Sequence, residues 1–110
     1  MKTGKTRQKR NILEAANVIR SKNSGPYELT LDIMFKDRHY YDLFRKERVI
    51  TRAKVARMYG IAESDVLKVI YFEPSLAVKM TIRRRIPSGA PGDSDIYGAH
   101  QHAPLLKITF

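Results

Sequence analysis

Hydrophobic and polar positions alternate most regularly over residues 27–35. The apolar residues fall on every second position, at Tyr27, Leu29, Leu31, Ile33 and Phe35. The positions between them are mostly polar, at Glu28, Thr30 and Asp32, with Met34 as the exception. A period of two residues predicts a β-strand with one face on the core and the other at least partly in water.

The segment over residues 6–22 has a different spacing, with apolar residues three and four positions apart and no Gly or Pro. These residues are Ile12, Ala15, Ala16 and Ile19, flanked by Leu13 and Val18. The spacing is typical of one face of a helix. Gly25 and Pro26 follow, and this pair stops a helix. We therefore predict a helix over residues 6–22.

Two short helices are predicted in the middle of the chain. Asp37 is placed to cap the first, over residues 38–47, which carries an aromatic stripe of Tyr40, Tyr41 and Phe44. We expect this stripe to pack on the sheet, with stacking on a cofactor as the alternative. The second helix starts at Arg52 after a Thr51 cap and ends at Gly60.

Three further strands are predicted over residues 66–72, 76–84 and 105–110. The break at Glu73, Pro74 and Ser75 favours a hairpin, and the long 27–73 segment favours a parallel crossover. The expected fold is a two-layer α+β domain: a four-stranded mixed sheet with helices mainly on one face, partly ferredoxin-like, and a long Gly/Pro/His loop before the last strand.

Composition and charge set the general class of the protein. The 110 residues suggest a single domain over residues 11–110 after a basic flexible tail over residues 1–10. The chain has no Cys, which excludes disulfides and thiol chemistry, and no apolar run long enough to span a bilayer. We expect a cytoplasmic protein that does not bind membranes.

The formal net charge of +10, taken alone, is typical of a protein that binds nucleic acid. The positive charge gathers in the tail, at Arg52, Lys54 and Arg57, and at residues 83–85, and the remainder of the chain is nearly neutral. No aromatic RNA-binding motif, zinc finger or GxxG loop accompanies it. A polyanion-binding module that uses the tail and the arginine clusters is therefore the alternative function, and nucleic acid is not the expected partner.

Residues 86–104 hold three of the five prolines, three of the six glycines and two of the three histidines. A loop of this length is usually functional or disordered, and its apolar Ile96 favours order. His102 or Asp93 is the candidate for acid–base catalysis. We assign no metal site, although His100 and His102, with carboxylates nearby, keep a two-histidine chelate open as an alternative.

Anion binding is the third chemistry open to this loop. Gly89 and Gly92 allow backbone N–H groups to converge on a phosphate or carboxylate, and Arg84, Arg85 and Lys22 are placed to assist. The spacing does not match a Walker loop. The alternative is that the loop has no binding role. It would then be a polar turn that hydrogen-bonds to its own backbone, or a structural connector.

A second polar cluster lies near residues 17–24. Arg20, Lys22 and Asn23 either provide routine chemistry at a helix C-terminus or belong to the same site as the loop.

Two stretches, residues 16–35 and 87–106, resemble a small prokaryotic family of unknown function whose genes often adjoin those of the acyclic-terpene-utilisation protein family. The resemblance covers roughly residues 10–110. Its matched polar and glycine positions are Arg20, Asn23, Gly92, Asp93, Asp95, Tyr97, Gln101 and His102. At His100 the family pattern has Gln, so a two-histidine chelate would be particular to this chain. The resemblance implies a large partner protein and a setting in acid and acyl-CoA catabolism.

From these observations we expect a small subunit or accessory domain of a heteromeric enzyme. Its substrate would be a carboxylic acid or a CoA ester, and the reaction an isomerisation, hydration or lyase step. The partner is expected to be the large protein of the acyclic-terpene-utilisation family, with a homo-oligomer also open. No cofactor is assigned, and a self-contained enzyme is disfavoured because the chain has little room for both a core and a closed pocket.

Overall fold

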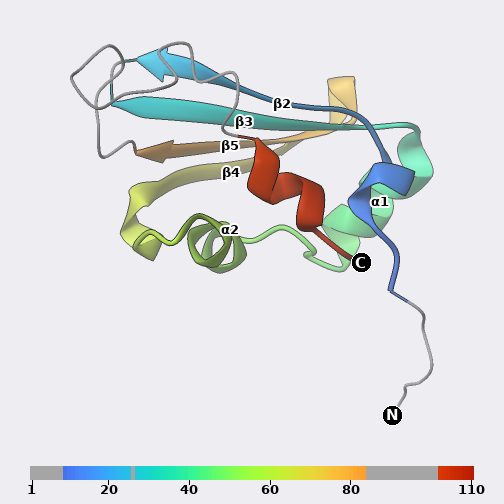
Figure 1. The fold of residues 1–110 in the computed structure, drawn as a ribbon. Helices are drawn as coiled ribbons and strands as arrows, with labels where there is room; N and C mark the ends of the chain where they lie inside the picture. The colour runs from blue at the N-terminus through green and yellow to red at the C-terminus, as the bar shows by residue number, and fades with distance from the viewer. Residues whose placement is uncertain (1–8, 26, 84–101) are drawn as a thin grey trace.

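The protein is an α+β structure built on one four-stranded sheet. The computed structural model describes residues 9–25, 27–83 and 102–110 (Figure 1). The strands lie side by side in the order β2 (Ala16–Gly25), β3 (Glu28–Phe35), β5 (Ala77–Arg83) and β4 (Val66–Phe72). Within the described residues, every neighbouring pair is antiparallel. The α+β class and the four-stranded sheet are confirmed.

The prediction of a mixed sheet with a parallel crossover was wrong. Strands β3 and β4 do run in the same direction, but β5 lies between them and is antiparallel to both. The short 3-10 turn η3 (Glu73–Ser75) returns the chain directly from β4 to β5, which confirms the predicted hairpin. Because β5 pairs with the edge of β3 that β4 would need, β3 and β4 are not hydrogen-bonded neighbours.

The helix predicted over residues 6–22 was also wrong. A single 3-10 turn, η1 (Ile12–Glu14), is followed directly by strand β2. The turn buries Ile12 and Ala15, and the strand then directs the partly buried Ile19 to the same core, so a turn followed by a strand reproduces the spacing of a helix. Val18 and Ile19 are β-branched, which favours a strand once β3 is available as a partner.

Helices α1 (Arg38–Lys46) and α2 (Arg52–Tyr59) both lie on one side of the sheet (Figure 1). The Asp37 side chain accepts a hydrogen bond from the Tyr40 backbone N–H at 3.2 Å, and Thr51 caps α2 in the same way. Gly60 ends α2 in the left-handed conformation (φ 63°), which a glycine adopts without steric cost. Both predicted helices and their caps are confirmed.

The core lies between the helices and the sheet. The apolar positions of β3 from Leu29 to Phe35 face it, as predicted, whereas Tyr27 lies before the strand and is 60 % exposed. The Phe44 ring lies 4.6 Å from the Phe35 ring, so the aromatic stripe of α1 packs on the sheet.

The N-terminal and C-terminal segments close the helix-bearing side of the core. The predicted strand over residues 105–110 was wrong: the chain forms the 3-10 helix η4 (Ala103–Lys107), followed by a single bridge from Thr109 to Asn11. Pro104 fits the first turn of a helix, which favours the 3-10 helix at this point of the chain. Buried Leu105, Ile108 and Phe110 still reach the core.

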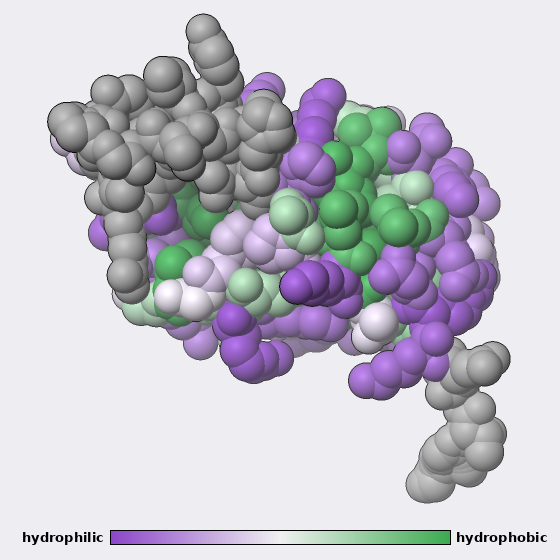
Figure 2. Space-filling model, viewed as in Figure 1, coloured by the Kyte–Doolittle hydropathy of each residue, from purple (hydrophilic) through white to green (hydrophobic). Residues whose placement is uncertain are grey.

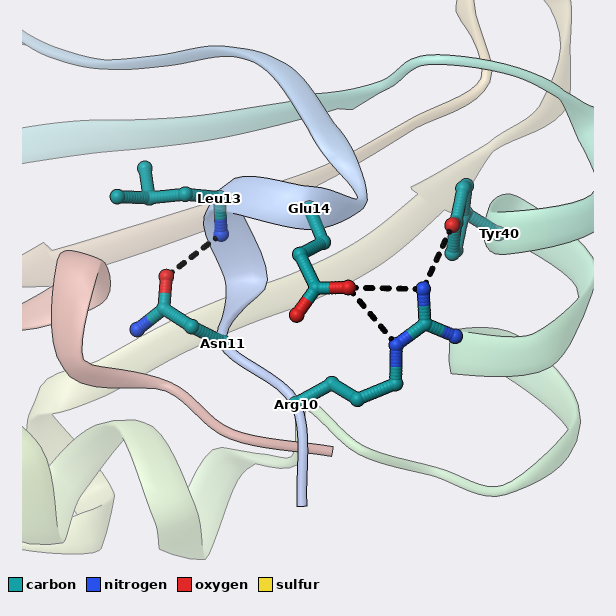
Figure 3. A network of polar contacts seen from close by, with 5 residues as sticks. All are labelled: Arg10, Asn11, Leu13, Glu14 and Tyr40. Carbon is teal, nitrogen blue, oxygen red and sulfur yellow. Dashed lines mark hydrogen bonds and ion pairs between the residues drawn. The ribbon is translucent and has the colours of Figure 1, made fainter. Parts of the chain in front are cut away.

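A polar network fixes this closure (Figure 3). The Asn11 side chain accepts a hydrogen bond from the Leu13 N–H and donates one to the Leu106 carbonyl, which joins η1 to η4. The Arg10 guanidinium donates to Glu14 at 2.9 Å and to the Tyr40 hydroxyl at 3.1 Å, which joins the N-terminal segment to α1. Backbone and side chains therefore hold the two ends of the described chain together.

Replacing Tyr71 with Phe tests how β4 is tied to the helices. The Tyr71 hydroxyl lies 3.2 Å from the Phe44 carbonyl and 3.4 Å from the Ile50 carbonyl, and burial raises its pKa. We expect Tyr71→Phe to lower the free energy of unfolding by about 1 kcal/mol, because a partly buried hydrogen bond is lost. Urea unfolding measures this change, and Tyr27→Phe at the exposed turn is the control. Equal stability of the two variants would contradict the role given to the hydroxyl.

Candidate functional site

The face of the sheet opposite the helices buries a carboxylate. Asp32 in the middle of β3 is only 1 % exposed, although it belongs to the polar positions of the alternating pattern. The register places it between Arg20 of β2 and Lys79 of β5. A carboxylate so deeply buried needs hydrogen bonds or opposite charges around it.

Asp32 is satisfied at one oxygen and not at the other. Its Oδ2 accepts a hydrogen bond from Arg20 Nε at 3.1 Å, while the Arg20 side chain remains 49 % exposed. Its Oδ1 is buried and has no hydrogen-bond partner in the described part of the chain. Lys79, across the strand pair, directs its ammonium over the Phe72 ring at 5.7 Å from the centroid. With respect to residues 9–25, 27–83 and 102–110, the buried Oδ1 is therefore an acceptor without a donor.

Exposed hydrophobic side chains accompany Asp32 on the same face. The strand register groups Asp32 with Val18 on β2 and with Ile70 and Phe72 on β4. Ile70 is 47 % exposed and Phe72 is 44 % exposed. We call Val18, Asp32, Ile70 and Phe72 the open-face cluster. Apolar groups around a buried polar centre are typical of surfaces that bind another molecule.

A separate pocket of about 390 Å³ lies on the helix-bearing side, between α2 and η4. It is lined by Lys54, Met58, Ala103, Pro104, Lys107, Ile108 and Thr109. Burial lowers the pKa of Lys54, and the positive charges of Lys9 and Arg57 lower it further. In Figure 2 the surface between α2 and η4 is mostly pale, from weakly hydrophilic to weakly hydrophobic, with strongly hydrophilic residues beside it. The pocket thus combines apolar walls with positive charge.

The structure separates the predicted polar cluster of Arg20, Lys22 and Asn23. Arg20 and Lys22 lie on the helix-free face, whereas the register of Asn23 with Leu29 places it on the core side. The three residues therefore do not form one site at a helix end.

The loop residues assigned to catalysis and binding lie mostly outside the described part of the chain. These are Gly92, Asp93, Asp95, Tyr97, His100 and Gln101, together with Arg84, Arg85 and Gly89. His102 is described: it is half-buried and directly precedes η4, whose residues line the pocket. Among the described residues, no three His, Asp or Glu side chains gather where they could hold a metal ion.

Several arginines of the basic clusters have partners within the protein. Arg52 donates a hydrogen bond to the Leu67 carbonyl at 3.4 Å, and Arg83 lies 3.7 Å from Asp65. Arg10 pairs with Glu14.

None of the helices in the described ranges is long and apolar enough to cross a membrane.

Sequence reasoning missed Asp32 and Lys54 as site residues. Asp32 was assigned to a partly wet face, because alternation gives the side of a residue but not what surrounds it. A signal for its burial was present, since a charged residue in mid-strand is unusual. Lys54 carried no such signal, because its pocket depends on η4, which comes about fifty residues later in the chain.

The Arg20–Asp32 pair leads to a stability prediction. We expect Arg20→Ala to lower the free energy of unfolding by about 1–2 kcal/mol, because the buried carboxylate loses its donor. In an Asp32→Asn background the same substitution should cost less, since no buried charge is left alone. Denaturant unfolding of the four proteins measures this coupling. Lys22→Ala, two residues along the same face, is the control, and additive effects of the two substitutions would contradict the pairing.

Comparison with known proteins adds a family but no function. The model of one family, described as a domain of unknown function (DUF4387), matches residues 12–109. Comparisons with curated proteins and with solved structures found no match. The matched region contains both helices, all four described strands, Asp32 and every residue that lines the pocket. Because the match covers nearly the whole sequence, the chain belongs to the DUF4387 family of domains of unknown function.

Proposed function

We propose that the protein is a small subunit or accessory domain of a heteromeric enzyme that acts on a carboxylic acid or its CoA ester, by isomerase, hydratase or lyase chemistry. The partner we propose is the large protein of the acyclic-terpene-utilisation family. One observation carries the subunit role: the buried Oδ1 of Asp32, on the helix-free face, has no hydrogen-bond donor among the residues that the structure describes. The metabolic setting and the identity of the partner rest on the family resemblance.

An unpaired buried acceptor favours association with another molecule. Leaving a buried polar group without a partner costs roughly 1–3 kcal/mol. Because Oδ1 is buried, a backbone N–H or side-chain donor of a partner protein reaches it only after the groups that cover it move aside, and it would then remove that cost in the complex. Desolvated polar groups at the centre of an interface often contribute most of its specificity.

The apolar members of the open-face cluster supply the remaining features of a protein interface. Ile70 and Phe72 project from β4, an edge strand of the sheet, and are nearly half exposed. Burying them against a partner would be favourable by about 25 cal/mol for each Å² of apolar surface removed from water. Lys79 over the Phe72 ring adds a positive charge beside them, which fits a partner surface with acidic groups.

Co-expression of the full chain with the large protein tests this proposal. The two proteins should co-purify in stoichiometric amounts. Ile70→Ser combined with Phe72→Ser should reduce the recovered complex by about tenfold or more, because the apolar part of the contact is lost. Tyr27→Ser, which removes an exposed aromatic side chain at the β2–β3 turn, is the matched control.

Circular dichroism of the isolated variants establishes that they remain folded. Failure of the unsubstituted proteins to co-purify would overturn the proposed partner. Equal loss of complex in the Tyr27→Ser control would overturn the assignment of the contact to the open-face cluster.

A further inference from the structure

The pocket between α2 and η4 has a lining suited to one class of small molecule. Its apolar part comes from Met58 on α2 and from Pro104 and Ile108 at η4. Its polar part includes two lysines, Lys54 and Lys107, one from each side. A volume of about 390 Å³ lies toward the small end of the range of ligand pockets, roughly 300–1,000 Å³.

The two charged side chains among the described residues that line this pocket, Lys54 and Lys107, are both positive. Lys54 is partly buried, and the groups that act on it electrostatically are Lys9 and Arg57, both cations. Within the described residues, no ion pair joins a carboxylate to Lys54 or Lys107. Partial burial of an unpaired ammonium is unfavourable, and an anion beside it would offset this cost.

We propose that this pocket binds a small carboxylic acid, with its carboxylate beside Lys54 and Lys107 and its hydrocarbon part against Met58, Pro104 and Ile108. The apolar walls favour an organic acid over inorganic phosphate, since phosphate leaves those walls unoccupied. The cations are lysines, which act as compact point charges, and none of the described residues lining the pocket is an arginine that could recognise phosphate in a bidentate way.

This inference deepens the proposed function and rests on it for its place in metabolism. The pocket, however, is formed by the chain alone and lies on the other side of the sheet from the open-face cluster. Binding is therefore measured on the isolated full chain. A failure to bind the acid is thus distinguishable from a failure to bind the large protein.

Titration of the isotopically labelled full chain with hexanoate tests the proposal by NMR. We expect saturable shifts of the Met58 and Ile108 amide signals. Lys54→Gln should weaken binding about tenfold, which corresponds to about 1.4 kcal/mol. Lys107→Gln, at an exposed position, should also weaken it and serves as the second variant. Lys68→Gln, at an exposed position on the opposite face, is the matched control and should leave the affinity unchanged.

Two further probes separate the parts of the ligand. Hexanol keeps the hydrocarbon chain without the charge, and inorganic phosphate keeps the charge without the chain; both should bind more weakly than hexanoate. Equal binding of hexanol would overturn the role of the lysines, and equal binding of phosphate would overturn the role of the apolar walls. Shifts confined to other parts of the chain, or an affinity insensitive to both pocket lysines, would overturn the proposed site.

Discussion

The pairing of β3 along both of its edges is the constraint on which the rest of the structure depends. With β2 on one side and β5 on the other, the backbone of β3 has no freedom to rotate, so alternate residues must point to opposite faces. The apolar positions form the core under the helices. The same geometry commits Asp32 to the middle of the other face, where it is buried. The charged site is thus a direct consequence of core formation.

The parts of the fold that could be predicted from the sequence are those formed by neighbours in the chain. The alternation in β3, the Asp37 and Thr51 caps and the β4–β5 hairpin all depend on contacts within a few residues, and all are confirmed. The N-terminal strand and η4 are different, because their conformation depends on distant partners. Ile12 and Ile108 are both buried in the core. The spacing of apolar residues around Ile12 is the same as in a helix, and the spacing around Ile108 is the same as in a strand, so the sequence pattern alone does not reveal the observed conformations.

The candidate sites show the same division between local and distant information. The sequence marked Arg20 as polar and functional, but its role as the donor to Asp32 depends on the β2–β3 register. The sequence groups Lys54 with the basic residues Arg52 and Arg57, and only the position of η4 beside α2 makes it part of a pocket. In both cases the residue type is visible in the sequence, whereas the neighbour that gives it a chemical environment comes from tertiary structure.

The hydrogen bond between Asn11 and the Leu106 carbonyl joins residues 95 positions apart in the sequence, and this separation bears on how the chain folds. Closing so long a loop costs chain entropy before any contact offsets it, so such contacts form late in folding. We therefore expect helix η4, which this bond anchors, to form among the last elements. A molecule that binds between α2 and η4 would therefore recognise the fully folded chain over partly folded forms, and would stabilise it by mass action.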